Sequence, residues 1–293
     1  MSLPRIAPYE IPALLPANRV AWRPRAGRCA LLIHDMQEHF LGAFDRGAPP
    51  IPEMMSNIIA LRERCRALGM PVIYSAQPGG QTLEQRGLLQ DFWGDGIAAG
   101  PEAQAIVPEL APADGEIVLT KWRYSAFVRT ELSEVLGDWG CDQLLITGIY
   151  GHIGCLMTAC HAFMQEVQPF FVADAIADFS AQDHARAVEW AAARCAVATT
   201  TADVLGALSV VRPLSRARVA GDILGALESA PAVLDGGDDL MDLGLDSIAV
   251  MGLLTAWREA GAEVSFEDLA EVEPTLDAWW PVIESRLRAI VSA

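Results

Sequence analysis

Short apolar segments alternate with longer amphipathic ones along the first two thirds of the chain. The short segments are aliphatic or β-branched and are bounded by polar, glycine or proline residues, which is typical of strands buried on both faces. They cover residues 29–33, 71–75, 117–120, 143–147, 169–173 and 196–200. The segments between them predict helices over about 52–68, 126–136, 154–166 and 181–194. This alternation predicts an α/β fold, with a Rossmann-like parallel sheet of about six strands flanked by helices.

The pattern becomes entirely helical toward the C-terminus. One apolar stripe has the i, i+3, i+4, i+7 spacing of an amphipathic helix and consists of Val250, Leu253, Leu254 and Trp257. Helices are expected over about 218–229, 247–260 and 275–290, with a short helical turn near 266–270. Glycine, proline and serine in residues 206–217 predict a linker, or a last helix that runs into one. We therefore expect a first domain over 1–208, a linker over 209–217 and a small all-α four-helix domain over 218–293.

Acidic residues support this division of the chain. The formal net charge is −17, and residues 216–293 alone contain 15 acidic and 5 basic side chains. This excess of acidic residues in about a quarter of the chain indicates a separate C-terminal unit. A field this negative does not favour binding to a nucleic-acid backbone or to an anionic membrane surface.

Cysteine usage and the N-terminal sequence bear on the cellular compartment. None of the six cysteines forms a C-x-x-C pair, which favours reduced cysteines in a cytoplasmic protein over disulfides or zinc. The histidines show no metal-ligand spacing, so we expect no metal site. The N-terminal residues lack the charged start and apolar run of a signal peptide, and no segment approaches the ~18 apolar residues of a membrane span.

Polar residues follow four of the predicted strands. Asp35 follows the first strand, Gln77 the second, Lys121 the third, and a glycine-rich turn over 148–155 the fourth. Taken singly, Asp35 is compatible with a helix cap and Lys121 with a solvated rim. Because ligands bind beyond the carboxyl ends of parallel strands, the four positions together favour a ligand site at that edge. The backbone N–H groups of the turn suit an oxyanion or a carboxylate.

The glycine-rich turn allows two further interpretations. Gly148, Gly151 and Gly154 do not complete a dinucleotide-binding fingerprint, so we expect no NAD. Cys155 begins a predicted helix whose dipole would lower a thiol pKa, and His152 lies three residues before it. A catalytic thiolate at Cys155 is therefore an alternative to chemistry centred on Asp35.

Several long stretches resemble the isochorismatases, which belong to the cysteine-hydrolase-like α/β superfamily. The resemblance runs from about residue 3 to 208 and is carried by LLIHDMQEHF, YSAQP, QRGLLQDFWGDG, LTKWRYSAF, LLITGIYGHIGC and VADAIADFS. The C-terminal LGLDSI resembles the attachment motif of acyl and aryl carrier proteins. In this order the two parts resemble the bifunctional isochorismatase/aryl carrier proteins of catecholate siderophore assembly.

The resemblance implies a catalytic site that lacks a nucleophile. The superfamily's aspartate and lysine match Asp35 and Lys121, whereas its nucleophilic cysteine matches Gly154. Cys155 lies one residue further, which turns its side chain by ~100° on a helix. The resemblance further implies substrate-binding roles for Phe40, Gln77, Arg86, Trp93, Tyr124 and Tyr150, although Trp93 is equally compatible with plain core packing. Gly151 stands where the family pattern has alanine.

The implied reaction is hydrolysis of the enol ether of isochorismate to 2,3-dihydroxy-2,3-dihydrobenzoate and pyruvate. It requires an acid that protonates the terminal methylene carbon, and Asp35 is the candidate. A neighbouring lysine lowers the pKa of an aspartate, which opposes protonation. A substrate carboxylate paired with Lys121 would offset that effect.

Ser247 is the candidate modification site of the C-terminal domain. A serine at a helix start is also a good N-cap, which is the structural alternative. The resemblance implies 4′-phosphopantetheine on Ser247, carrying an aryl group, 2,3-dihydroxybenzoyl, as a thioester. It also implies as partners a phosphopantetheinyl transferase, an aryl-AMP ligase and the condensation domain of a nonribosomal peptide synthetase. Met251, Phe266 and Ala270 are the expected contact patch, although they suit an ordinary core equally well.

Two alternatives remain at this point. One is a cysteine-dependent amidase or nicotinamidase with its thiolate at Cys155. The other is an inactive first domain that serves as a dimeric scaffold for the carrier. The family resemblance suggests a homodimer in either case.

Overall fold

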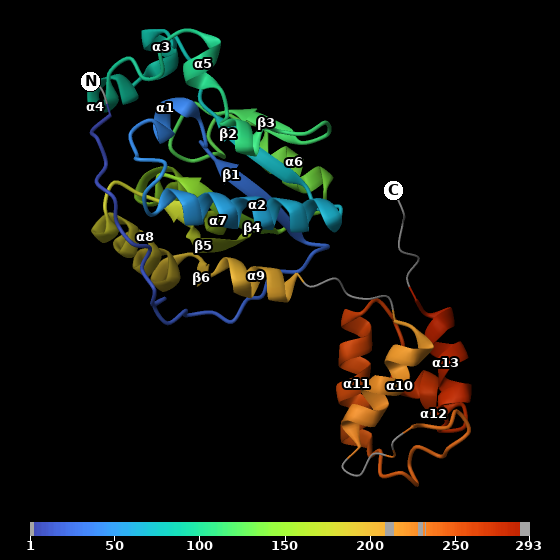
Figure 1. Ribbon diagram of the computed structural model, residues 1–293. Coiled ribbons are helices and arrows are strands. Elements are labelled where there is room, and N and C mark those ends of the chain that lie inside the picture. Colours follow the sequence, from blue (N-terminus) through green and yellow to red (C-terminus); the bar gives the residue numbers. More distant parts are fainter. Residues whose placement is uncertain (1–2, 209–213, 228–230, 232, 288–293) are drawn as a thin grey trace. The chain divides into compact units, whose positions relative to one another are not determined.

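The computed structural model describes residues 3–208, 214–227, 231 and 233–287 (Figure 1). Contacts between α-carbons divide the chain into two compact units, Met1–Ser209 and Val210–Ala293. Each unit has its own hydrophobic core, so each is described by itself.

The first unit is built on one parallel sheet. Its six strands are β1 (Cys29–His34), β2 (Val72–Ala76), β3 (Ile117–Thr120), β4 (Gln143–Ile149), β5 (Gln168–Ala177) and β6 (Val197–Thr199). They lie in the order β3-β2-β1-β4-β5-β6, and every adjacent pair is parallel. The predicted six-stranded parallel sheet is confirmed, with β1 between β2 and β4 at its centre.

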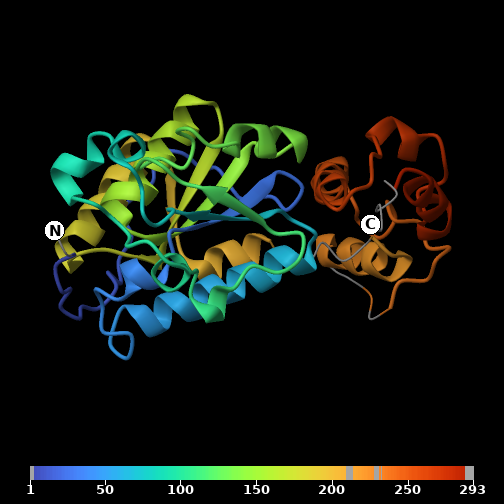
Figure 2. The ribbon, with the colours of Figure 1, turned by 90° about the horizontal axis from the view of Figure 1, so that it is seen from above.

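Helices cover both faces of this sheet (Figure 2). Successive residues of β1 point to opposite faces, so Leu31 and Ile33 pack in one core with α2 (Ile51–Ala67) and α9 (Thr201–Ala207). Ala30 and Leu32 belong to the other core. That core includes residues of α6 (Leu132–Asp138), α7 (Leu156–Met164) and α8 (Ala181–Arg194).

Two predicted helices begin later than expected. The helix predicted over 126–136 begins at Leu132, because Arg129 has a left-handed φ of 62° and the Thr130 hydroxyl donates to the carbonyl of Ala126. The helix predicted over 154–166 begins at Leu156, after a π-helical turn over Gly151–Cys155. The structure thus inserts an irregular turn at the strand end where a ligand site is expected.

Four short helices surround the carboxyl edge of the first strands. They are α1 (Glu38–Leu41), α3 (Leu83–Arg86), α4 (Leu89–Trp93) and α5 (Pro101–Gln104), and a 3-10 turn covers Pro108–Leu110. Each is at most five residues long, too short to produce a helical period in the sequence. α3 and α4 bring Arg86 and Trp93 to this edge.

The second unit is all-α, as predicted. It contains α10 (Arg216–Ala226), α11 (Ser247–Glu259), α12 (Phe266–Ala270) and α13 (Leu276–Ser285). The apolar stripe of α11 is buried, and its Trp257 packs edge-to-face on Trp279 with ring centroids 6.5 Å apart. The expected linker over 209–217 falls partly outside the described residues, and α10 begins within it. Among the described residues, no helix is both long and apolar enough to cross a membrane.

Candidate functional site

The polar strand ends meet in one pocket at the carboxyl edge of the sheet. β1 ends beside both β2 and β4, so the residues that follow these strands become neighbours. The pocket is lined by all nine residues expected in it: Asp35, Phe40, Gln77, Arg86, Trp93, Lys121, Tyr124, Tyr150 and Gly154. The structure brings these residues together, whereas their individual roles remain predictions.

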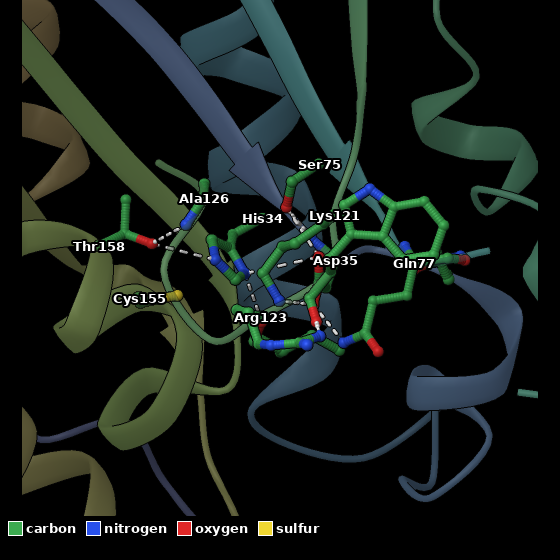
Figure 3. A network of polar contacts seen from close by, with 12 residues as sticks. His34, Asp35, Ser75, Gln77, Lys121, Arg123, Ala126, Cys155 and Thr158 are labelled. Carbon is green, nitrogen blue, oxygen red and sulfur yellow. Dashed lines mark hydrogen bonds and ion pairs between the residues drawn. The ribbon is translucent and has the colours of Figure 1, made fainter. Parts of the chain in front are cut away.

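Asp35 is the most densely bonded side chain of the pocket (Figure 3). Ser75 Oγ donates to its Oδ1 at 2.7 Å, and Lys121 Nζ and Gln77 Nε2 donate to its Oδ2 at 2.8 and 3.1 Å. Asp35 is 4% exposed and Lys121 is 2% exposed. Burial alone would raise the pKa of Asp35, but the charge of Lys121 and the hydrogen bonds from Lys121 and Ser75 outweigh it and hold the pKa below its usual value. The carboxylate is therefore ionised and held in place.

Behind Asp35, the imidazole of His34 is fully buried. Its Nδ1 lies 3.0 Å from the carbonyl oxygen of Ile149, and its Nε2 lies 3.3 Å from Thr158 Oγ1. Thr158 Oγ1 already accepts the N–H of Ala126, so its own proton is available to Nε2 and the ring proton belongs on Nδ1. Burial lowers the pKa of His34 to about 4, so the ring is neutral at physiological pH.

Two glycines allow the ends of β1 and β4 to approach this closely. A Cβ on Gly148, whose φ is 102°, would lie 2.2 Å from the backbone oxygen of His34. A Cβ on Gly154 would lie 2.2 Å from Cε1 of the His34 ring. Both contacts are far shorter than van der Waals distance, so glycine is required at position 148, within β4, and at position 154, in the turn that follows β4.

Aromatic side chains form the apolar wall of the pocket. Trp93 Nε1 donates to the Tyr124 hydroxyl at 2.7 Å, which places Trp93 in the wall, where the sequence left core packing open. The Tyr150 hydroxyl donates to the carbonyl of Phe40 at 3.0 Å, and the Tyr150 ring lies 4.4 Å from that of Phe179. Burial raises the pKa of Tyr150, so its hydroxyl remains protonated.

Cationic groups give the pocket a positive field. Arg86 is buried, and its Nε donates to the carbonyl of Gly94 at 2.8 Å. Arg123 Nη1 is held by the carbonyl of Gln85 at 2.9 Å. With Lys121, these two arginines give the pocket three positively charged side chains against the one carboxylate of Asp35. The pocket therefore suits a small anion with more than one negative charge.

Sequence reasoning missed part of the pocket. Ser75 lies on β2, as predicted, but no pattern in the sequence indicated that its hydroxyl donates to Asp35. Phe179 follows β5, which was expected to end at residue 173 but extends to Ala177. His39 and Arg123 also line the pocket, and burial together with the charge of Arg86 lowers the pKa of His39. Leu3 and Pro4 of the N-terminal arm lie in the wall as well, and no local pattern could have indicated this.

Cys155 does not have the environment of a nucleophile. It is fully buried, it is absent from the pocket lining, and its Sγ lies 3.8 Å from the carbonyl of Thr147. Burial raises the pKa of its thiol well above the ordinary value, the opposite of an activated cysteine. The geometry therefore gives no support to a thiolate at this position. Within the described ranges, no group of three or more His, Cys, Asp or Glu side chains is arranged to hold a metal ion.

In the second unit, Ser247 is the first residue of α11 and is exposed. The N-cap is Asp246, whose side chain accepts the N–H of Ala249 at 2.8 Å, so the capping role considered for Ser247 belongs to its neighbour. Met251 is 50% exposed and Phe266 40%, and Ala270 is exposed too. These three residues thus lie on the surface and not in the core. Ile248, beside Ser247 and not predicted as part of this surface, is 82% exposed.

Comparison with known proteins assigns a family to each unit. An isochorismatase domain matches residues 29–203, and a phosphopantetheine attachment site matches residues 217–279. The chain is 45% identical to an isochorismatase of Bacillus subtilis, over 99% of this chain and 98% of that protein. It is 40% identical to enterobactin synthase component B of Escherichia coli, over 98% of this chain and all of that protein.

Solved structures agree with the fold of the first unit. A cysteine hydrolase from Pseudomonas syringae aligns with a TM-score of 0.59 and 23% identity, over 66% of this chain and 97% of that one. At this identity the likeness concerns the fold alone. The match of the family model to most of the first unit, and the two relatives that span nearly the whole chain, show that the chain belongs to the isochorismatase family.

Proposed function

We propose that the first unit hydrolyses the enol ether of isochorismate to 2,3-dihydroxy-2,3-dihydrobenzoate and pyruvate. The observation that carries this proposal is the buried Asp35 carboxylate, 2.8 Å from Lys121, in a pocket where position 154 has no side chain. The pocket offers a carboxyl group, several cations and aromatic walls, but its described lining includes no cysteine, serine or threonine side chain.

In this proposal Asp35 is the general acid. Its proton adds to the terminal methylene carbon of the enol ether and leaves an oxocarbenium ion. Water then attacks the cationic carbon, and the proton that it loses returns to Asp35. The hemiketal then breaks its bond to the ring oxygen, which takes up the proton of the hemiketal hydroxyl, and this gives pyruvate and the dihydrodiol. The balance is one water consumed and Asp35 restored, with no covalent intermediate.

Asp35 can act as an acid only if it becomes protonated when the substrate binds. In the free protein Lys121, Gln77 and Ser75 all donate to this carboxyl group and favour its ionised form. Isochorismate has two carboxylates, and one of them paired with Lys121 would partly cancel the positive charge felt by Asp35. Binding is therefore coupled to the uptake of a proton by Asp35.

The remaining pocket residues would hold the substrate. Arg86, Gln77 and Tyr150, with the backbone N–H of Gly154, line the pocket, and we expect them to contact the carboxylates and other oxygens of the substrate. Phe40, Trp93 and Tyr124 would enclose the ring. Arg123 adds a further cation close to Arg86. Burial lowers the pKa of the Arg86 guanidinium, the charge of Asp95 opposes this, and the charge of Arg123 lowers the pKa further.

The test is release of pyruvate from isochorismate, followed with lactate dehydrogenase. Asp35→Asn should reduce kcat by about 10³-fold, within the range ascribed to general acid catalysis. Ser247→Ala serves as the matched control and should release pyruvate at the wild-type rate. Near-normal turnover by Asp35→Asn would refute the role of this aspartate, and no turnover by the wild-type chain would leave only a scaffold role.

For the second unit we propose a carrier function, with 4′-phosphopantetheine on Ser247. The residues fit this group, because the exposed Ser247 hydroxyl lies in the first turn of the 13-residue α11, where backbone N–H groups favour a phosphate. The attached group would supply a thiol that holds 2,3-dihydroxybenzoyl as a thioester. Intact mass before and after incubation with coenzyme A and a phosphopantetheinyl transferase tests this, since the gain in mass should vanish in Ser247→Ala.

The exposed surface around Ser247 supports the proposed partners. A phosphopantetheinyl transferase, an aryl-AMP ligase and a synthetase condensation domain must each reach the serine. Met251, Phe266 and Ala270 present apolar atoms for such encounters, and the negative charge of this unit suits basic partner surfaces. Substituting Met251 with Glu should slow aryl transfer and leave pyruvate release unchanged.

We further propose two domains, 1–208 and 218–293, joined over 209–217, in a cytoplasmic homodimer. The division into two compact units supports the domains, and six free thiols suit a reducing compartment. Light scattering on the full chain tests the dimer.

A further inference from the structure

His34 is a buried polar side chain that the proposed reaction does not use. It lies outside the pocket lining, yet its ring approaches both the acid and the turn, with Nδ1 3.7 Å from Asp35 Oδ1. Its two hydrogen bonds reach the end of β4 at Ile149 and α7 at Thr158. The imidazole therefore connects three elements that meet behind the pocket (Figure 3).

The ring occupies the volume that a side chain at position 154 would need. The nearest three atoms to a Cβ built on Gly154 are all His34 ring atoms, at 2.2, 2.9 and 3.0 Å. Overlap of this kind is relieved only if the ring moves. Such a move would break its bonds to Ile149 and Thr158, because both ring nitrogens are engaged. The hydrogen-bonded position of the His34 ring is therefore compatible only with glycine at position 154.

The bond to Ile149 also positions the turn. Ile149 ends β4, and the next residue, Tyr150, leads into the turn Gly151–Cys155. The Ile149 carbonyl accepts the Nδ1–H of a ring at the end of β1, and Asp35 is the residue that directly follows this strand. The same imidazole thus fixes the distance between the acid and the turn that faces it.

We propose that His34 is a positioning and specificity-determining residue. It holds the turn Gly151–Cys155 against β1, and its ring fills the space that any side chain at position 154, including a nucleophile, would need. Because no nucleophilic side chain fits at position 154, the pocket is left with Asp35 as its reacting group. The kinetic part of this inference rests on the proposed isochorismate hydrolysis, whereas the steric part does not.

A double-mutant cycle on the full chain tests the steric part. Gly154→Ala alone should lower the Tm of the first unit by about 5 °C, because it overpacks a rigid core. In a His34→Ala background the same substitution should lower Tm by no more than about 1 °C, because the ring is gone. Equal losses in the two backgrounds would overturn the coupling. This readout does not depend on isochorismate turnover, so its failure is distinct from failure of the proposed function.

A second pair of variants tests positioning. His34→Asn keeps an N–H donor for the Ile149 carbonyl, and His34→Leu has a similar shape without a donor. We expect kcat/KM for pyruvate release to fall about 10²-fold in His34→Leu and less than tenfold in His34→Asn, at comparable Tm. A purely apolar packing role would instead favour leucine, so equal or better activity of His34→Leu would overturn the proposal.

Discussion

The two candidate functional residues, Asp35 and Ser247, lie in opposite kinds of environment. Asp35 is 4% exposed and accepts three hydrogen bonds, from Ser75 on β2 and from Gln77 and Lys121, which directly follow β2 and β3. Ser247 is exposed, and within the described part of the chain no hydrogen bond of its hydroxyl is found. This difference follows from their proposed roles. A reacting acid must be held in one position and shielded from water, whereas an attachment point must be accessible to other enzymes. Mutations near Asp35 should therefore affect stability and chemistry together, and mutations at Ser247 should affect modification alone.

The largest effect is expected from Lys121→Met. It leaves the Asp35 carboxylate buried without its cation, which costs about 3–5 kcal/mol for a broken buried ion pair. Urea unfolding of the first unit measures this loss. The control is Arg216→Met in the second unit, where both partners of the ion pair with Asp277 are about half exposed, and where we expect a change below about 1 kcal/mol. Equal losses of unfolding free energy in Lys121→Met and Arg216→Met would show that burial does not strengthen the Lys121–Asp35 ion pair.

The next effect concerns pH. The pKa of His34 is about 4 in the folded chain and about 6.5 in an unfolded one, so the unfolded state binds the extra proton between these values. The free energy of unfolding of the first unit is therefore highest above pH 6.5 and falls by about 3 kcal/mol as the pH drops toward 4. Between pH 7 and pH 4.5 the urea midpoint of the first unit should fall further in wild type than in His34→Asn, because asparagine does not titrate. A constant difference between the two proteins would contradict a neutral buried imidazole.

A smaller effect is expected from Asp246→Ala in the second unit. Asp246 caps α11 through the N–H of Ala249, and loss of an N-cap costs about 1 kcal/mol. Urea unfolding of the second unit should show this loss, while pyruvate release stays unchanged. No loss of stability in Asp246→Ala would return the capping role to Ser247.

The smallest effect on stability is expected from Ser247→Ala. Because the serine is exposed and Asp246 provides the cap, unfolding of the second unit should change by less than about 0.5 kcal/mol. The reverse control is Asp35→Asn, which should gain phosphopantetheine at the wild-type rate. If either variant impaired the other unit's activity, the independence of the two sites would be lost.

The sequence was sufficient to predict the sheet and the residues at its edge. Buried parallel strands have a strong local pattern, and parallel strands place their carboxyl ends at one edge, so the proximity of Asp35, Gln77 and Lys121 followed from topology. The prediction that Arg86 and Trp93 belong to the same pocket depended on family resemblance, because α3 and α4 are too short for periodicity to detect.

The contacts around His34 could not be predicted. The sequence shows a histidine at a strand end, but its closeness to Gly154 depends on side-chain packing between segments that lie 120 residues apart. The extension of β5 to Ala177, which brings Phe179 to the pocket, was hidden because Asp174 interrupts the apolar run. Asp174 is satisfied within the fold by the N–H and hydroxyl of Thr201, a pairing that only the tertiary structure shows.

The N-terminal arm has a practical consequence for handling the protein. Leu3 and Pro4 line the same pocket as Asp35, and further along the arm the Tyr9 hydroxyl receives the N–H of Asp178 at 2.7 Å. A purification tag joined ahead of Leu3 would therefore begin close to the wall of the pocket, and we expect it to weaken the binding of isochorismate. Kinetic constants measured with such a tag should be compared with those of the cleaved protein before any loss of activity is assigned to a pocket residue.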